Sequence, residues 1–429
     1  MPTIMRDRII LLTMLAALPM GSVMAVETNQ VPALTLDACL AEAARRQPDI
    51  AAAKEAVQRA EFQYKAALSA FLPQLSANAS ASRSRAGVSS SAVVGDDYTA
   101  NLQAQESLYT GGHDTALLNQ RRAERDLARE QLQQALAQLS ADVHTAFASL
   151  LYAVDAIAQT TAIVKLRADD AGLVELRYEG GREHKGNLLL MQALLNQARF
   201  DEESARRTLG LARQRLARAL GREQAVPAVS GMLTVVAPEP EPDYEKLTGS
   251  VPSVRMALAQ VRAASAGVRV AKSEYFPTIS AAAGYGRNDD VFLPQNNNWS
   301  VGVQLNYAFF PGGRNIMDVR SAQSDERRFG WLLRSQWQQT LVDLQQAYNA
   351  WWDAAQQSHV QQQFLQAAEL RAEIARSQYT SGLMSFDDWA IIENDLIAQQ
   401  KADLTARRDA VLAQAAWEKA CGVSLLPLN

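Results

Sequence analysis

Cysteine and histidine are scarce in this chain of 429 residues, which contains two cysteines and four histidines. Two cysteines cannot build a disulfide scaffold, and no Cys/His group has the spacing of a metal site. We therefore expect no metal and no cofactor. Cys39 and Cys421 could form one disulfide, but two buried free thiols are favoured. The histidines are scattered, and we expect them to be solvated or to serve packing: His113, His144, His184 and His359.

Catalytic and nucleic-acid-binding signatures are also missing. The sequence has no G-x-S-x-G, H-E-x-x-H, G-x-G-x-x-G or Walker motif, which argues against an enzyme. Its net charge is −4, with 21% charged residues, so no basic surface points to nucleic acid.

Long hydrophobic runs are absent except at the N-terminus. Arg6 and Arg8 precede a short apolar run at residues 9–18, and a small-x-small signal ends at Ala25. This pattern predicts a secretory signal peptide over residues 1–25. A membrane anchor is the alternative, but a spanning helix needs about 20 apolar residues. We expect no other segment to span a bilayer as a helix, and no cysteine stands directly after the cut to carry a lipid.

Proline is absent between Pro73 and Pro227 and again between Pro311 and Pro427. Within these stretches, residues 113–177 and 315–378 are rich in good helix formers, which predicts two very long helices. In the first, apolar residues recur with alternating spacings of four and three, the pattern of a coiled-coil seam. The seam consists of Leu132, Leu136, Leu139, Val143, Ala146, Leu150, Ala153 and Ile157. The aromatic residues of the second helix, such as Trp331 and Trp351, are expected to pack between helices.

The chain is an internal repeat of about 200 residues. "RYEGGREHKGN" at 177–187 matches "QYTSGLMSFDD" at 378–388, so that Gly181 corresponds to Gly382. A glycine in each motif interrupts an otherwise helical pattern, which predicts that the chain reverses there, since glycine readily adopts the left-handed conformation that ends a helix. The two repeats are expected at 26–226 and 250–429, joined by a proline-rich crossover at 227–249.

Four short segments alternate between apolar and polar residues, which predicts strands with one apolar face. They lie near residues 74–86, 98–109, 277–287 and 299–310. Leu75 and Ala77 alternate with Ser76 and Asn78, and in the last segment the apolar series runs from Trp299 to Phe309. Strands of about ten residues with aromatic residues near their ends are typical of outer-membrane barrels. A soluble antiparallel sheet packed on the helices is the alternative.

The lengths predict how the elements combine. Each long helix matches two shorter helices placed end to end, and the remaining segments, 26–47, 223–249 and 423–429, are expected to form a belt at mid-height. Four strands cannot close a barrel, and an open sheet edge cannot lie in lipid. The chain must therefore form an oligomer, with two copies giving eight strands and three giving twelve. The expected fold class is mostly α with a small β part: long antiparallel coiled-coil helices, four transmembrane strands and an oligomeric barrel.

The sequence resembles the TolC family of outer-membrane efflux and secretion channels. The resemblance rests on "LTLDACLAEAARRQPDIAAAK" near the start, on FLP and YFP before the strand pairs, and on YTGG and FPGG after them. We call the two expected chain reversals, near Gly181 and Gly382, the first and the second tip. The second tip has the complete family pattern Y-x-x-G-x-x-S-x-x-D. The first tip has His184 and Asn187 at the serine and aspartate positions.

The resemblance implies a homotrimer with a twelve-stranded barrel in the cell outer membrane and a helical tunnel in the periplasm. It implies an exit duct for a tripartite efflux pump or a type I secretion system, docked to a periplasmic adaptor and an inner-membrane pump. The alternative is a pore-less periplasmic coiled-coil scaffold or adaptor, which would need no alternating strands.

The candidate site residues lie at the two tips, near 178–187 and 379–385. The residues expected to dock the adaptor are Tyr178, Gly181, Tyr379, Gly382 and Ser385. Asp388, with Asp387 in support, is expected to face the tunnel entrance, where the aspartates of several copies would attract cations. The alternative for Asp388 is a capping role at the positive end of a helix.

Overall fold

The computed structural model describes residues 34–86, 93–226, 228–426, and all the elements below lie in these ranges. The expected signal peptide, residues 1–25, lies outside them. The helices are α1 (Leu36–Arg46), α2 (Pro48–Leu68), the 3-10 turn η1 (Ser69–Phe71), α3 (His113–Glu179), α4 (Lys185–Ala219), α5 (Tyr244–Thr248), α6 (Pro252–Ser273), α7 (Arg314–Thr380) and α8 (Phe386–Ala420). The strands are β1 (Gln74–Ala86), β2 (Val93–Tyr109), β3 (Thr278–Asp289) and β4 (Asn296–Asn306).

The two long helices are present, and α3 and α7 each have 67 residues. At 1.5 Å per residue each extends about 100 Å. The predicted seam of α3 is buried from Leu136 to Ala153, while Leu132 and Ile157 at its ends are half-buried. The heptad pattern therefore marks the packed side of this helix. By length and composition α3 also contains a window apolar enough to cross a membrane, contrary to the sequence-based expectation. A core helix passes the same test, and α3 packs against α2, α4, α6 and α8.

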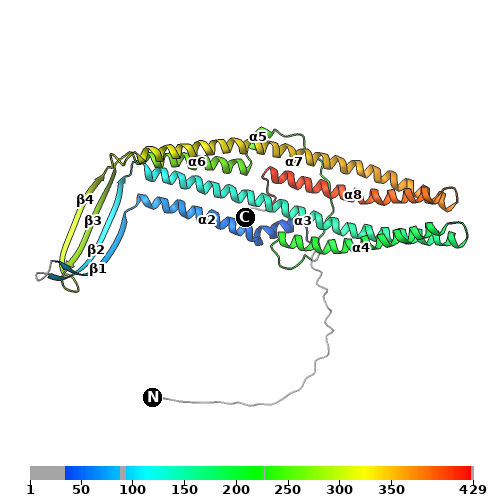
Figure 1. Cartoon of the computed structure of the whole chain (residues 1–429), viewed down its shortest axis with the longest axis horizontal. Coiled ribbons are helices and arrows are strands. Elements are labelled where there is room, and N and C mark those ends of the chain that lie inside the picture. Colours follow the sequence, from blue (N-terminus) through cyan, green and yellow to red (C-terminus); the bar gives the residue numbers. More distant parts are fainter. Residues whose placement is uncertain (1–33, 87–92, 227, 427–429) are drawn as a thin grey trace, which may run out of the picture. The chain divides into compact units, whose positions relative to one another are not determined.

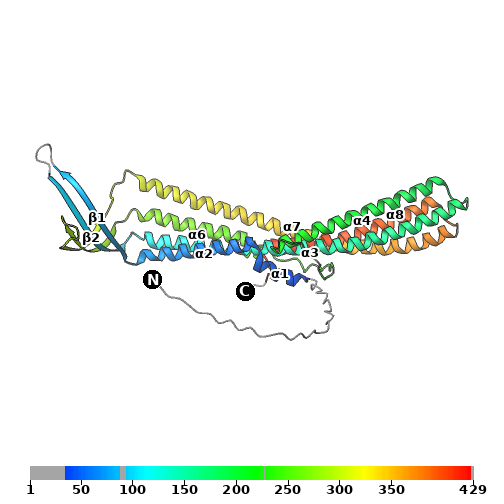
Figure 2. The ribbon, with the colours of Figure 1, turned by 90° about the horizontal axis from the view of Figure 1, so that it is seen from below.

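The helices form two hairpins, α3 with α4 and α7 with α8, which meet where α3 packs against α8 (Figures 1 and 2). The lateral order near the tips is therefore α4–α3–α8–α7. Near the sheet, α2 packs on α3, and α6 packs between α3 and α7, which gives the order α2–α3–α6–α7. Both orders leave α7 at one edge.

The four strands in the described part of the chain form one antiparallel sheet in the order β1-β2-β3-β4. β1 pairs with β2 from Gln74↔Gln105 to Ala86↔Val93, and β3 pairs with β4 from Thr278↔Asn306 to Asn288↔Asn296. Among the residues that the structure describes, the outer edges of β1 and β4 have no partner strand. The sheet edges thus continue the helix order, with β1 on the side of α2 and β4 on the side of α7.

Three strand boundaries differ from the prediction by three residues or more, and one of them is the start of β4, which lies at Asn296 rather than at 299. β2 begins at Val93, five residues before the predicted start at 98, because its partner β1 continues to Ala86. β4 ends at Asn306, so the predicted continuation to 310 was wrong. Asn306 pairs with Thr278, the first residue of β3, and the residue before it is Pro277, which has no N–H to donate to a ladder. Tyr307 and Phe309 therefore lie beyond the strand.

The expected mid-height belt is formed by α1, residues 223–249 and the C-terminal segment as far as they are described. Leu34 forms a parallel bridge with Val229, and the backbone N–H of Leu425 donates to Ser140 Oγ of α3 at 3.1 Å. One apolar cluster joins α1, α3, the end of α4, Val226 and Leu426. The crossover is also held by Tyr348 of α7, whose hydroxyl donates to the carbonyl of Glu239 at 2.7 Å.

Both cysteines are free thiols, as favoured from the sequence, although only Cys39 is fully buried and Cys421 is half-buried. Burial raises the pKa of Cys39 to about 11 and that of Cys421 to about 12. The aromatic expectation holds for Trp351, which stacks with Trp417 of α8 at 6.5 Å between ring centroids. It fails within one chain for Trp331, which is 67% exposed.

Candidate functional site: two helix tips and an apolar sheet face

Both tips reverse the chain by the same hydrogen-bonding pattern. After α3, the N–H of Arg182 donates to Arg177 O at 2.8 Å, and the N–H of Gly181 donates to Tyr178 O at 2.9 Å. After α7, Leu383 and Gly382 donate in the same way to residues 378 and 379. This double pattern is a Schellman motif, which needs a left-handed residue at the position of each glycine.

The conformations of the two glycines agree with this requirement. Gly181 has φ +67° and Gly382 has φ +78°, and a Cβ built at either position would meet no atom within 4 Å. Backbone conformation, rather than lack of space, therefore selects glycine at the tips.

The helices that leave the two tips begin differently. At the second tip Ser385 is the N-cap of α8, and its Oγ accepts from the N–H of Asp388 at 3.1 Å and donates to Asp388 Oδ2 at 2.6 Å. At the first tip the side chain of His184 makes no capping bond. Instead Glu183 Oε1 accepts from His184 N at 3.1 Å and from Asn187 Nδ2 at 2.8 Å.

Asp387 and Asp388 are both exposed in the first turn of α8. The contact that the chain gives Asp388 is the capping contact with Ser385, and the negative charges also favour the positive end of the helix dipole. A role at a tunnel entrance requires further copies of the chain, and it stays a prediction.

The two tips are bound to each other through Tyr379. Its hydroxyl donates to Glu183 Oε2 at 2.9 Å, and Arg177 Nη1 donates to its carbonyl at 2.6 Å. Its ring stacks on Trp389 with centroids 4.3 Å apart and planes 3° apart, and the guanidinium of Arg177 lies 4.4 Å from the ring centre. Burial raises the pKa of the Tyr379 hydroxyl, and the hydrogen bond to Glu183 raises it further.

The repeat symmetry is broken at the two tyrosines. Tyr178 is 38% exposed, whereas Tyr379 is 1% exposed and belongs to the core of the tips. Within one chain Tyr379 thus holds the tip together and offers no surface to a partner. Sequence reasoning missed three contacts of Tyr379, namely Arg177, Glu183 and Trp389. Two of them are neighbours of residues that it singled out: Arg177 directly precedes Tyr178, and Trp389 directly follows Asp388. The exposed tip surface includes Tyr178, the glycine turns and Leu383.

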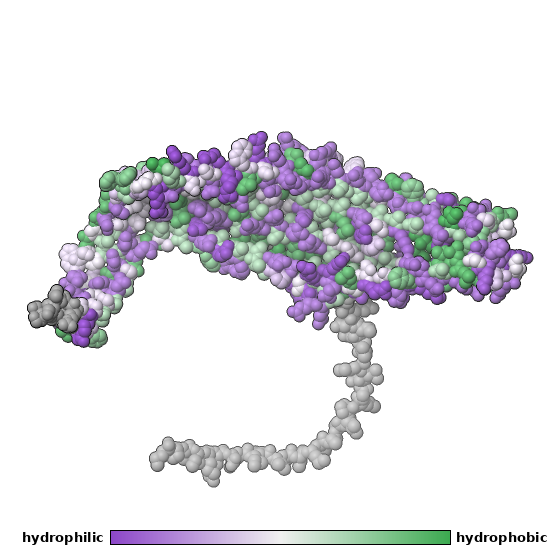
Figure 3. Space-filling model, viewed as in Figure 1, coloured by the Kyte–Doolittle hydropathy of each residue, from purple (hydrophilic) through white to green (hydrophobic). Residues whose placement is uncertain are grey.

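The sheet at the other end of the helices carries exposed apolar side chains on one of its faces. In the view of Figure 3, hydrophobic and hydrophilic residues lie side by side over the sheet. Apolar residues face each other across the strands, as in Ala77↔Leu102, Ala283↔Val301 and Tyr285↔Trp299. Val301 at the centre of β4 is 74% exposed. The opposite face is polar and includes a hydrogen bond of 2.7 Å between Ser80 and Thr99.

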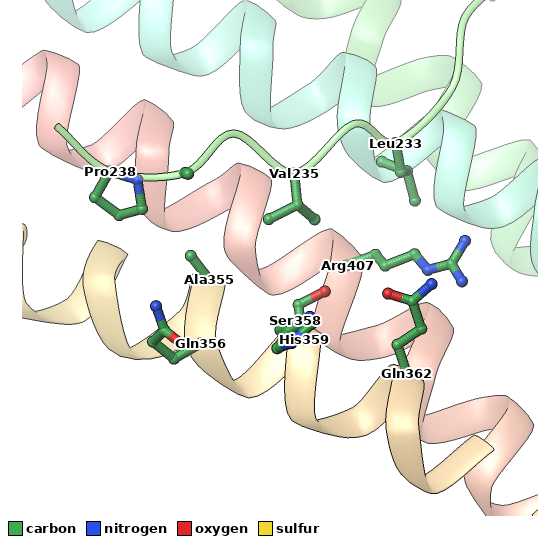
Figure 4. Close-up of a pocket in the computed structure, with 10 residues that line it drawn as sticks. Leu233, Val235, Pro238, Ala355, Gln356, Ser358, His359, Gln362 and Arg407 are labelled. Carbon is green, nitrogen blue, oxygen red and sulfur yellow. The ribbon is translucent and has the colours of Figure 1, made fainter. Parts of the chain in front are cut away.

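A pocket of about 450 Å³ lies where the crossover passes over α7 and α8 (Figure 4). Its lining is mixed, with Leu233, Val235 and Pro238 from the crossover and Gln362 and Arg407 from the helices. Arg407 is paired with Asp403 at 2.7 Å. Among the described residues no group of three or more His, Cys, Asp or Glu could hold a metal ion.

The sequence matches the profile of a family described as outer membrane efflux protein, over residues 39–222 and 244–423. The two matched segments are separated by residues 223–243. The chain belongs to the outer membrane efflux protein family. The resemblance to TolC-type channels seen in the sequence is thereby confirmed, and the family places this efflux protein in the outer membrane.

Two curated relatives match parts of this efflux protein. A protein described as a probable outer membrane lipoprotein, SilC of Salmonella typhimurium, is 25% identical over 230 residues, half of each chain. Protein CyaE of Bordetella pertussis is 26% identical over 264 residues, 59% of this chain and 55% of CyaE. The chain thus spans about half the length of the curated relatives it matches.

Solved structures show the same fold over nearly the whole efflux protein. A CusC structure superposes with a TM-score of 0.83 at 18% identity, covering 90% of this chain and 92% of that one. The outer membrane protein VceC of Vibrio cholerae superposes with a TM-score of 0.79 at 20% identity, covering 91% and 96%. The expected fold of long helices with a small antiparallel sheet is confirmed.

Proposed function

We propose that this outer membrane efflux protein is the exit duct of a tripartite efflux pump or a type I secretion system. It passes small molecules or proteins from an adaptor and an inner-membrane pump across the periplasm and the outer membrane. The observation that carries this proposal is the sheet with an exposed apolar face, a polar opposite face and two unpaired edges.

The apolar face fits lipid better than water. Large side chains such as Trp299, Val301 and Val303 would expose a contiguous apolar surface if the sheet were soluble, and monomeric soluble proteins rarely expose large apolar patches. The polar face, with Ser80, Thr99 and Ser300, suits a water-filled lumen. Alternation of this kind is the pattern of transmembrane barrel strands.

The unpaired edges require further copies of the chain. In lipid, the N–H and C=O groups along β1 and β4 would cost several kcal/mol each if left unpaired. Because the two edges differ, the contact is head-to-tail, with β1 of one copy beside β4 of the next, and such contacts form a ring where the rotation between copies closes. Three copies give twelve strands and a lumen, in keeping with the trimers of this family. The helix edges α2 and α4 then meet α7 of the next copy.

The helices supply the periplasmic part of the duct. α3 and α7 extend about 100 Å from the sheet to the tips, which carries the lumen across much of the periplasm. The tips are the parts farthest from the membrane, and their exposed residues, Tyr178, Gly181, Gly382 and Ser385, are the proposed contacts for the adaptor. Tyr379 supports this surface from beneath by joining the two tips.

Isolation of the mature chain from outer-membrane fractions tests this function. We expect heat-modifiable trimers that resist detergent, with a native mass three times that of the mature chain. A pore-less periplasmic scaffold would instead be recovered from the soluble periplasmic fraction. A stable monomer in detergent would contradict the duct, because a single chain leaves both sheet edges open.

A further inference from the structure

A cluster of charged side chains is buried where the two helix hairpins meet, a few turns from the tips. Asp170 of α3 is 0% exposed and Glu393 of α8 is 1% exposed. Arg167, one turn before Asp170, is also buried, and Arg376 reaches the cluster from α7. Buried carboxylates are uncommon unless they are fully paired, so the contacts of this pair need an explanation.

The contacts of the cluster cross between the hairpins. Asp170 Oδ1 accepts from Arg376 Nη2 at 2.9 Å, which links α3 to α7. Arg167 Nη2 donates to Asn394 Oδ1, which links α3 to α8. Glu393 Oε1 accepts from Trp389 Nε1 at 3.2 Å, one turn earlier on α8. The cluster thus forms part of the seam between the α3–α4 hairpin and the α7–α8 hairpin.

The pairing within the cluster is incomplete. Among the described residues, Asp170 Oδ2, Glu393 Oε2 and Arg167 Nη1 have no hydrogen-bond partner although all three atoms are buried. An ionised carboxylate can only accept hydrogen bonds, whereas a protonated one also donates. One proton bound to either carboxyl would therefore remove one of the two buried negative charges. It would also turn one of the two unpartnered acceptors, Asp170 Oδ2 or Glu393 Oε2, into a hydrogen-bond donor.

The charged groups that face Asp170 come from three helices. Arg167 and Asp169 lie on its own helix α3, Arg376 lies on α7, and Glu393 lies on α8. The fourth helix, α4, contributes apolar residues to the neighbouring core, among them Met191. Burial, the largest cause, and the nearby Glu393 together raise the pKa of Asp170 to about 7, because the two arginines oppose this rise only in part. Burial also raises the pKa of Glu393.

A second ion pair in the same seam behaves differently. Asp201 of α4 accepts from Lys401 Nζ of α8 at 2.6 Å. Although burial raises the pKa of Asp201, the hydrogen bonds from Lys401 and Gln197 outweigh it and leave that pKa below its ordinary value. The carboxylate of this cross-hairpin pair is thus ionised at neutral pH, in contrast to the Asp170–Glu393 cluster.

We propose that Asp170 and Glu393 together form a proton-binding site that controls how tightly the two hairpins pack: the seam is closed when the proton is bound and loosens when both carboxyls are ionised. The ligand is a proton, and the conformational element is the packing of α3 against α8. The proposal concerns the chain itself and does not depend on what the duct transports.

The direction of the pH effect follows from linkage. In the closed seam the pKa of Asp170 is about 7, while in an opened and hydrated seam it returns toward about 3.9. Opening therefore releases a proton, and a rise in pH through about 7 favours opening. The stabilisation from protonation is fully present below about pH 4 and is lost as the pH rises through about 7.

Hydrogen exchange of the mature chain in detergent measures this effect. Peptides that cover residues 160–176 and 386–400 report on the seam, and their exchange rates are corrected for the intrinsic effect of pH. Between pH 5.5 and pH 8.0 we expect their protection in the parent chain to fall by about 30-fold, the change that one such shifted carboxyl produces. Asp170→Asn, which is neutral at both values, should show no such fall.

Two further variants keep the test decisive. Glu393→Gln should also reduce the pH dependence, and it replaces Asp170→Asn if that variant does not assemble. Asp201→Asn is the matched control, because it removes an ion pair from the same seam: it should lower protection equally at both pH values and retain the dependence of the parent. A parent chain whose protection does not change with pH would overturn the proposal. So would an unchanged dependence in both Asp170→Asn and Glu393→Gln, or its loss in Asp201→Asn.

Discussion

Replacing Val301 by arginine would place a charge at the centre of β4, on the apolar face of the sheet. Val301 pairs with Ala283, is 74% exposed, and lies midway between the ends of the strand at Asn296 and Asn306. Arginine on the lipid face of a barrel at mid-membrane costs about 2–4 kcal/mol per chain. In a trimer the three copies together would cost about 6–12 kcal/mol.

The neighbouring residue provides a matched control. Ser300 pairs with Gly284 and points to the polar face of the same strand. Ser300→Arg introduces the same side chain one position away, and we expect it to leave the trimer intact while it changes conductance through the lumen. Val301→Arg, at 2 kcal/mol or more, should lower the ratio of folded to unfolded protein by at least about 30-fold per chain.

The assay is the amount of detergent-resistant trimer in outer-membrane fractions from cells that express the two variants equally. The size of the loss of trimer distinguishes a lipid-facing sheet from a soluble one. On a soluble sheet, an exposed position such as Val301 would tolerate arginine within about 0.5 kcal/mol. Equal trimer levels for both variants would refute the assignment of this face to lipid.

Three further predictions concern the tips. Gly382→Trp should abolish export but leave trimer assembly intact, because the side chain meets no neighbouring atom and the strained backbone costs only about 1–2 kcal/mol; export at normal protein levels would exclude adaptor docking at this tip. Asp388→Ala should reduce cation selectivity and block by trivalent cations in planar bilayers, whereas unchanged values would leave Asp388 as a capping residue, and Asp387→Ala should have the smaller effect. Tyr379→Phe should destabilise the junction of the tips by about 1.5–3 kcal/mol, since it removes a hydrogen bond to a charged group, and limited proteolysis at residues 180–184 would detect this. Hydrogen bonds from Asn187 and Tyr379 hold the pKa of Glu183 below its ordinary value despite burial. The stabilisation of the tip junction by ionised Glu183 should therefore persist above about pH 4.3 and be lost as the pH falls through the lowered pKa. Tyr379→Phe should weaken this pH dependence.

Local sequence patterns predicted the features that depend on local physics. The heptad spacing from Leu136 to Ala153 identified the buried side of α3, and the runs of good helix formers gave the extents of α3 and α7 to within two residues at each end. The glycines at 181 and 382 predicted the chain reversals because few other residues adopt the left-handed conformation at low cost. Alternation predicted all four strands that the structure describes.

Features that depend on a partner segment could not be read in this way. The end of β4 is set by Pro277, which directly precedes β3, and the pattern from Trp299 to Phe309 does not reveal this. The different burial of Tyr178 and Tyr379 arises because Trp389 and Glu183 both contact the second tyrosine, whereas the repeat alone predicts equivalent environments. The buried charges at Asp170 and Glu393 lie 223 positions apart in the sequence, so only the packing of α3 against α8 brings them together.

Single-channel recording in planar bilayers tests the central claim that this chain forms a duct. Purified trimers of the mature chain should produce discrete conductance steps, and Ser300→Arg should change the size of these steps because its side chain lines the lumen. Trimers that enter the bilayer in known amounts but carry no current, with or without that substitution, would contradict the account.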